Sequence, residues 1–387
     1  MNKIKKIILN NFIKGINMDN TDFHDRMLDI NRELNLRAEV SWDEEKTTKY
    51  IEKLFRDEYE VHRFNKTGLY IKIPGEIDKT VAFRSDIDAL PYNFEDGLKV
   101  IHACGHDAHM TTLIGLLFKL KLTNYKPKYN LLFIFQPAEE AGSGAKYVLE
   151  HDILNDVEFM FGMHVRPKNE LKGNEFSSSI QHGASATLHV DITTTEGHAG
   201  RPWESINSID IAMALNQKIK ALNNEKDRSF SVKMTTIETL GGTHNTIPGT
   251  VNCVFDVRAQ YNDKMASLQE NIDRICEMIK GQYDCTLKYY YSSNTVAAEV
   301  SDEARNILTE VLREQQHDYI ETIVTPGAED FHTYSNTLPE IKTTMLGIGC
   351  NMIHGLHHPE MKYDKESIFT AINVYYNVIK KIDKKVS

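Results

Sequence analysis

The stretch that decides the fold is an apolar run that ends in a turn and two carboxylates, Asn130-Leu131-Leu132-Phe133-Ile134-Phe135-Gln136-Pro137-Ala138-Glu139-Glu140. A continuous apolar run between turn residues is typical of a strand that is buried on both faces. Strands of this kind belong to sheets that helices cover on both sides. The stretch therefore predicts an α/β domain in which Glu139 and Glu140 lie just past the carboxyl end of a central strand.

Two other segments bring polar side chains to the same kind of position. Residues 158–163 form an apolar strand pattern that leads to His164, and residues 80–84 form a shorter one that leads to Asp86. In open α/β sheets, sites gather beyond the carboxyl ends of the strands. We therefore expect these segments to meet at one edge of a mixed sheet.

The densest group of possible metal ligands is a nine-residue stretch, Ile101-His102-Ala103-Cys104-Gly105-His106-Asp107-Ala108-His109. Sulfur, nitrogen and oxygen donors together suit zinc, cobalt or manganese. A loop centred on Gly105 can turn Cys104 and His106 inward together, ahead of a buried helix over residues 111–118. A nucleophilic Cys104 with His106 as its base is the alternative, although it leaves the adjacent glutamates unexplained.

Glu139 and Glu140 can divide two tasks, because adjacent side chains point in different directions. One can bind metal while the other takes a proton from water, whose pKa a metal lowers from 15.7 to about 7. Without a metal, the same pair is typical of a solvated helix N-terminus. His164, and the loop residues His357 and His358, are further candidate ligands, although a single histidine is more often structural.

Asp86 and Asp88 follow a predicted strand directly. They can orient ligand histidines through the second ring nitrogen, or they can cap a turn. Arg258 shares a strand face with Asp256. It can hold a substrate carboxylate in a fork or pair with a surface acid, and the pattern favours the surface pair.

The middle of the chain predicts a second domain. Strand and helix patterns follow one another as strand–helix–strand–strand–helix–strand, which is typical of a ferredoxin-like α+β layer. The helices are expected near residues 205–222 and 263–281. We therefore expect a catalytic domain made of residues 1–183 and 294–387, interrupted by an inserted domain at 184–293. Further helices are expected over 302–316, from about 328, and over 364–384.

Composition limits the class of protein. The chain has 387 residues, of which 41% are hydrophobic and 26% charged, which is ordinary for a soluble globular protein. Its net charge of −10 argues against nucleic acid or an anionic membrane as the main partner. Five irregularly spaced cysteines favour reduced thiols and a cytoplasmic location. Residues 1–11 fail as a signal peptide, and no transmembrane helix is expected.

Taken in order, the motifs resemble those of the aminoacylase-like metallopeptidase and amidohydrolase family. The nearest branch contains the N-acyl-amino-acid amidohydrolases, such as hippurate hydrolase and indole-acetyl-amino-acid hydrolase. The resemblance covers nearly the whole chain. It rests on residues 84–91, 102–107, 135–140, 162–164, 245–248, 327–331 and 356–359.

The resemblance implies a zinc-peptidase-like catalytic domain with two divalent ions (zinc, manganese or cobalt) per subunit. The implied ligands are Cys104, His106, Glu140, His164 and His357. Glu139 corresponds to the general base. His198 and Asn245 correspond to residues that polarise the scissile carbonyl, and Arg258 to an anchor for the substrate carboxylate.

The implied reaction is hydrolysis of the amide bond of N-acyl amino acids, and a dipeptidase or aminopeptidase using the same site is the alternative. The inserted domain is expected to act as a lid and to form a homodimer, in which His198 acts in its own or the partner subunit. The chain departs from the family pattern before His198, where Thr195-Glu196 replaces a glycine pair, and in the early helix at residues 29–34.

Overall fold

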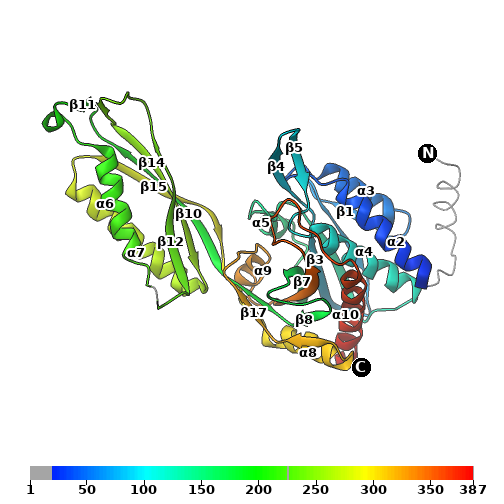
Figure 1. Ribbon diagram of the computed structural model, residues 1–387. Coiled ribbons are helices and arrows are strands. Elements are labelled where there is room, and N and C mark those ends of the chain that lie inside the picture. The colour runs from blue at the N-terminus through cyan, green and yellow to red at the C-terminus, as the bar shows by residue number, and fades with distance from the viewer. Residues whose placement is uncertain (1–19, 225, 387) are drawn as a thin grey trace. The chain divides into compact units, whose positions relative to one another are not determined.

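The computed structural model describes residues 20–224 and 226–386, which group into two compact units (Figure 1). The first unit contains the described residues up to 180, with 299–323 and 333–386; the second contains 181–298 and 324–332. The segment weighed as a signal peptide, residues 1–11, lies outside the described residues. The expected division into a catalytic domain and an inserted domain at residues 184–293 stays a prediction.

An eight-stranded mixed sheet forms the centre of the first unit, in the order β1-β2-β6-β3-β7-β18-β8-β16 (Figure 1). Its strands are β1 (Val61–Arg63), β2 (Leu69–Ile73), β3 (Ile77–Asp86), β6 (Tyr129–Gln136), β7 (Val157–Pro167), β8 (Glu175–Ser177), β16 (Asp318–Ile320) and β18 (Lys342–Met352). The four central strands β6, β3, β7 and β18 are mutually parallel. Their carboxyl ends therefore meet at one edge, and the predicted α/β class with a mixed sheet is confirmed.

The helices of this part of the fold are α2 (Asn20–Asn35), α3 (Glu45–Phe55), α4 (His106–Leu122), α5 (Gly144–Leu149), α8 (Asp302–Glu314), α9 (His332–Thr337) and α10 (Glu366–Asp383), followed by the short helix η2 (Lys384–Val386). Helices α2, α3, α4, α8 and α10 contribute apolar side chains to the core around this sheet, and α5 and α9 are further helices of the fold. Helix α4 is buried at 14 of its 17 positions, including the polar residues of its first turn as well as the apolar residues that follow. A Cβ added to Gly115 of α4 would lie 2.2 Å from Cδ1 of Ile372 in α10, so helices α4 and α10 are in close contact.

Two predicted helix starts differ from the structure. Helix α4 begins at His106 instead of near residue 111, so that the last residues of the cysteine–histidine stretch are helical. The helix expected from about residue 328 begins at His332. There the carboxylate of Glu329 accepts a hydrogen bond from the amide of Phe331 at 3.1 Å, which holds the chain in a turn before the helix begins.

The second unit is built on a four-stranded antiparallel sheet in the order β12-β14-β10-β15. Its elements are β10 (Ala184–Thr193), α6 (Ser208–Lys220), β12 (Phe230–Thr239), β14 (Thr250–Ala259), α7 (Asn262–Gln282) and β15 (Thr286–Thr295). Buried and partly exposed residues alternate along β14, and α6 and α7 cover one face of the sheet (Figure 1). This connectivity and strand order are those of a ferredoxin-like α+β layer, as predicted.

Short pairs complete the fold: β4 (Leu90–Phe94) with β5 (Gly97–Ile101), β11 (Gly197–His198) with β13 (Thr246–Ile247), and β9 (Ile180–His182) with β17 (Ile323–Thr325). A short helix, η1 (Pro202–Glu204), follows β11. Across residues 20–224 and 226–386, the structure contains no helix with both the length and the apolar character needed to cross a membrane.

Candidate metal centre

The candidate ligands of the first unit come from the edge where the parallel strands end. Glu140 follows β6, His164 lies near the end of β7, and His357 lies in the loop after β18. Cys104 and His106 come from the turn that opens α4. The sheet therefore brings together five residues that are up to 253 positions apart in the sequence.

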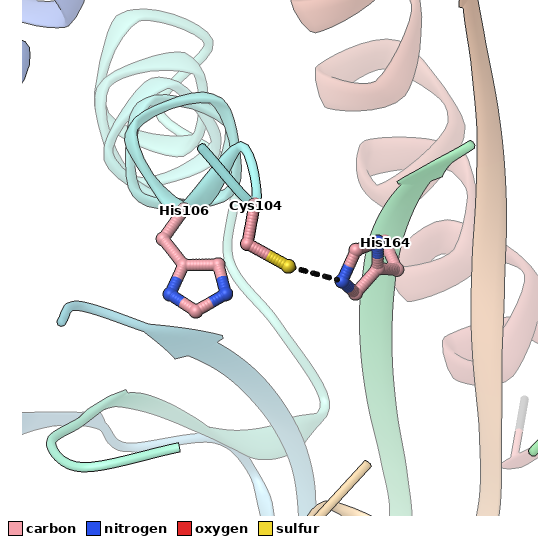
Figure 2. Close-up of side chains that lie close together, drawn as sticks. All are labelled: Cys104, His106 and His164. Carbon is pink, nitrogen blue, oxygen red and sulfur yellow. Dashed lines mark hydrogen bonds between the residues drawn. The ribbon is translucent and has the colours of Figure 1, made fainter. Parts of the chain in front are cut away.

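The turn at Gly105 makes the close approach of Cys104 and His106 to β7 feasible. Gly105 has a φ of +82°, and a Cβ at this position would lie 2.4 Å from Cγ2 of Val165. Glycine adopts this left-handed conformation without the steric cost that other residues incur. Figure 2 shows the result: Cys104 Sγ points toward His164 and lies 3.4 Å from its Nε2 atom.

The ligand atoms form two groups that share one residue. The ligand atoms of Cys104, His106 and His164 lie within 4.8 Å of one another, and so do those of Cys104, Glu140 and His357. His357 Nε2 lies 3.5 Å from Glu140 Oε1, and His106 Nε2 lies 3.9 Å from the same oxygen. Zinc binds nitrogen and oxygen at about 2.0–2.2 Å, so separations of this size suit atoms that share an ion.

Neighbouring groups fix the orientation of His106. Its Nδ1 atom lies 3.0 Å from the carbonyl oxygen of Asp88 and 3.3 Å from the carboxylate of the same residue. The Asp88 carboxylate also accepts hydrogen bonds from the amide of Glu140 at 2.9 Å and from the hydroxyl of Ser41 at 2.7 Å. Nδ1 is thus engaged and Nε2 is directed toward the ligand cluster, which is the usual arrangement behind a metal-binding histidine.

His357 is held through its backbone. It has a left-handed φ of +63°, its amide donates to the carbonyl oxygen of Ala103 at 2.8 Å, and its own carbonyl oxygen accepts from the Tyr92 hydroxyl at 2.8 Å. The adjacent His358 instead stacks on His354, with ring centroids 4.3 Å apart. The geometry therefore brings His357, and not His358, to Glu140.

Burial makes the charged forms of these side chains costly. Burial and the nearby Glu140 raise the pKa of the Cys104 thiol well above its usual value, and burial raises the pKa of Glu140 as well. Burial lowers the pKa of His164. Burial would also lower the pKa of His106, but Asp86, Asp88 and Cys104 outweigh it and raise that pKa well above normal.

The buried polar atoms fit a bound cation. His106 Nε2 and Glu140 Oε1 are buried and make no hydrogen bond within the described part of the chain. Leaving such atoms unsatisfied costs about 1–3 kcal/mol each. A divalent cation satisfies a nitrogen, a carboxylate oxygen and a thiolate at once, and it favours their deprotonated forms.

His109 lies in the predicted ligand-rich stretch, but the sequence alone assigns it no role. Its Nδ1 atom lies 2.8 Å from Asp86 Oδ1, and its Nε2 atom accepts a hydrogen bond from the amide of Val165 at 3.0 Å. Both ring nitrogens are thus engaged, so His109 links Asp86 to the residue after His164. The helical spacing of His106 and His109 was the available signal, since residues three apart share one helix face.

Glu139, the predicted general base, lies in the first unit, with Oε2 3.9 Å from His106 Nε2. The predicted residues His198, Asn245 and Arg258 lie in the second unit. His198 is exposed on β11, where it pairs with Thr246 of β13, and the carbonyl oxygen of Asn245 accepts a hydrogen bond from the amide of Ala199 at 2.9 Å. His198 and Asn245 are therefore neighbours. Arg258 donates from Nε to Asp256 Oδ1 at 3.0 Å, which is the surface pair that the strand pattern favoured.

At the edge of the mixed sheet, the cysteine, histidine and carboxylate groups form a cluster that could hold divalent cations. It belongs to Peptidase family M20/M25/M40, whose model matches residues 82–381.

The chain is similar to N-acetylcysteine deacetylase of Bacillus subtilis (strain 168), with 29% identity over 367 residues that cover 90% of this chain and 94% of the relative. It is 27% identical to N-acetyldiaminopimelate deacetylase of the same strain over 374 residues, covering 92% and 98% of the two chains. The crystal structure of a dinuclear metal-binding peptidase of the M20 family from Bacillus subtilis has a TM-score of 0.79 at 25% identity, covering 94% and 99%.

Proposed function

We propose that this protein hydrolyses the amide bond of N-acyl amino acids, with N-acetyl amino acids as the first substrates to test. The observation that carries the proposal is the pair of ligand groups that share Cys104, with the Glu139 carboxylate 3.9 Å from His106 Nε2. The deacetylase relatives and the dinuclear relative support the substrate class and the number of cations.

Cys104, His106, Glu140, His164 and His357 would hold two divalent cations. When bound, such cations lower the pKa of water to about 7 and polarise an amide carbonyl. Zinc, manganese and cobalt all accept this mixture of sulfur, nitrogen and oxygen donors.

Glu139 is the proposed proton carrier. Its side chain is 10% exposed and lies beside the ligand cluster, so water and substrate can reach it. Glu139 takes a proton from the attacking water and then delivers it to the leaving amine nitrogen. Glu139 and Glu140 each place a carboxylate oxygen 3.9 Å from His106 Nε2, and that of Glu140 also lies 3.5 Å from His357 Nε2. This favours Glu140 as the metal ligand and leaves Glu139 for proton transfer.

His198 is proposed to donate a hydrogen bond to the scissile carbonyl, with Asn245 beside it. The Nδ1 atom of His198 accepts a hydrogen bond from the amide of Gly200 at 3.0 Å, so in the neutral ring the proton is on Nε2. A donor aimed at the developing oxyanion stabilises the transition state.

We further propose a homodimer formed through the second unit, in which His198 serves its own or the partner subunit. Arg258 is the proposed anchor for the substrate carboxylate.

A nucleophilic Cys104 is a weaker proposal. Burial and Glu140 raise the pKa of its thiol, whereas a nucleophilic cysteine needs a lowered pKa. The two mechanisms also differ in their inhibitors, because only the metal-dependent one predicts inactivation by chelators.

The test is a substrate panel on purified protein that has been stripped of metal and refilled with zinc, manganese or cobalt. We expect turnover of N-acetyl amino acids, weaker or no turnover of dipeptides, and two ions per chain by elemental analysis. Glu139→Gln is the matched variant: it should keep its metal and lose about 10²-fold or more in kcat, which is the scale of general-base catalysis. Near-normal turnover by this variant, or no turnover by any refilled wild-type sample, would contradict the proposal.

A further inference from the structure

The segment that precedes helix α3 carries a buried carboxyl group for which the proposed mechanism has no role. Glu44 is 0% exposed. Its Oε2 atom accepts a hydrogen bond from the Thr67 hydroxyl at 2.6 Å, and its Oε1 atom accepts one from the amide of Ala138 at 2.8 Å. Both donors are neutral, so hydrogen bonds alone compensate for the burial of this group.

The amide that donates to Glu44 belongs to Ala138, the residue directly before Glu139. Ala138 is fully buried and has a left-handed φ of +53°. This conformation is unfavourable for alanine and persists only where surrounding contacts enforce it. The carbonyl oxygen of Ala138 accepts a hydrogen bond from the amide of Gly144 at 3.0 Å. Glu44 thus secures the amide side of the turn through which the chain leaves β6.

The other side of Glu139 is secured in the same way. The amide of Glu140 donates to the carboxylate of Asp88, which also accepts a hydrogen bond from Ser41. Glu139 therefore lies between two amides, each bonded to a buried carboxyl group. Residues 41–44 contribute to both of these supports, through Ser41 on one side and Glu44 on the other.

We propose that Glu44 is a positioning residue for Glu139, acting through the amide of Ala138. This inference rests on the proposed function, since it concerns proton transfer by Glu139. Glu140 has its own support in Asp88, so loss of Glu44 should misdirect Glu139 more than it disturbs the metal ligands. A displacement of about 1 Å at a reacting group can cost about 10²-fold in rate.

The central comparison is between Glu44→Ala and Glu44→Gln, assayed on an N-acetyl amino acid with metal content measured in parallel. Glu44→Ala removes the acceptor for the Ala138 amide. It should lower kcat about 10- to 100-fold while KM and metal content stay within about 2-fold of wild type. Glu44→Gln keeps a carbonyl oxygen for this amide and should retain kcat within about 3-fold.

Glu39→Ala is the matched control for loss of structure. Glu39 accepts hydrogen bonds from the amides of Lys46 and Thr47 in the first turn of α3, so its loss weakens the same helix without touching Ala138. This variant should melt at a lower temperature and keep its kcat. If Glu44→Ala does not fold, Glu44→Asp takes its place, because the shorter carboxylate does not reach the Ala138 amide.

Three results would overturn the inference. The first is a kcat for Glu44→Ala, or for Glu44→Asp in its place, within about 3-fold of wild type. The others are a fall in metal content that matches the fall in kcat, and an equal loss of kcat in Glu39→Ala. Failure of the proposed function looks different. In that case wild type itself would not hydrolyse N-acyl amino acids, or Glu139→Gln would remain active, and this inference would fail with it.

Discussion

Buried carboxyl groups hold single residues of the candidate site in place through hydrogen bonds and close polar contacts. Asp88 lies against the Nδ1 atom of His106, and Asp86 lies against the Nδ1 atom of His109. Glu44 accepts a hydrogen bond from the amide of Ala138. Each of these acids is fully buried. Burying a carboxyl group is unfavourable unless hydrogen bonds satisfy it, and the hydrogen bonds that these three acids make also fix polar groups at one edge of the sheet.

Stability should therefore depend on pH through Glu44. Burial, opposed by the bond from Thr67 and reinforced by Asp88, raises the pKa of Glu44 to about 7, so the folded state binds its proton more tightly than the unfolded chain does. The stabilisation from this proton is complete below the unfolded pKa of about 4.5 and is lost as pH rises through about 7.

Glu44→Gln removes this titration. Relative to wild type, the variant should gain about 2–3 kcal/mol between pH 4.5 and pH 8.5. The measurement is urea unfolding of both metal-free proteins at several pH values. A stability difference that does not change with pH would show that Glu44 does not titrate in this range.

The residues that offer donor atoms could be predicted, because thiols, imidazoles and paired carboxylates are recognisable by type and by their position after apolar runs. Asp86 and Asp88 could also be predicted as groups that orient histidines, because they directly follow a strand, but the other partners could not. His109 stands in the predicted ligand-rich stretch, but its bond to Asp86 does not follow from the sequence, and Glu44 looks like an ordinary acid. Only the fold brings Glu44 to Ala138, 94 residues away.

At the scale of elements, the site depends on where helix α4 begins. Gly105 caps the helix in a left-handed conformation, with Val165 of β7 directly against it. The turn delivers Cys104 from just outside the helix and His106 from its first residue. The sequence indicated a turn at Gly105 but placed the helix later, because two histidines and an aspartate in its first turn do not resemble an apolar helical pattern.

Gly105→Ala should destabilise the metal-free protein by about 2–4 kcal/mol. About 1 kcal/mol or more comes from the left-handed backbone, and the rest comes from the clash of the new Cβ with Val165. Urea unfolding monitored by circular dichroism measures the loss. Gly97→Ala is the control, since Gly97 also has a positive φ, of +118°, but a Cβ there meets no atom within 4 Å. Equal losses in the two variants would refute the role of the close contact with Val165.

At the scale of the whole molecule, two units with separate apolar cores carry different parts of the predicted machinery. The five candidate ligands and Glu139 belong to the first unit, and His198, Asn245 and Arg258 to the second. The change of strand pattern in the sequence, from continuous apolar runs to alternating residues, is the reason that we expect two domains. The sequence did not predict which residues of the first unit pair with one another, since that depends on the order of strands in the sheet.

Metal removal should therefore destabilise one unit selectively. Ions that bind only the folded state stabilise it by about 2.7 kcal/mol when their free concentration is 100 times Kd. Hydrogen exchange, followed by mass spectrometry in dilute urea, can report on both units in one sample. With a chelator present, amides of α4 and β7 should exchange faster, whereas amides of β14 and α7 should be unchanged, and refilling with zinc, manganese or cobalt should restore the slow exchange. Equal loss of protection in both units would contradict the location of the ligands, and no loss in either would contradict the binding of cations itself.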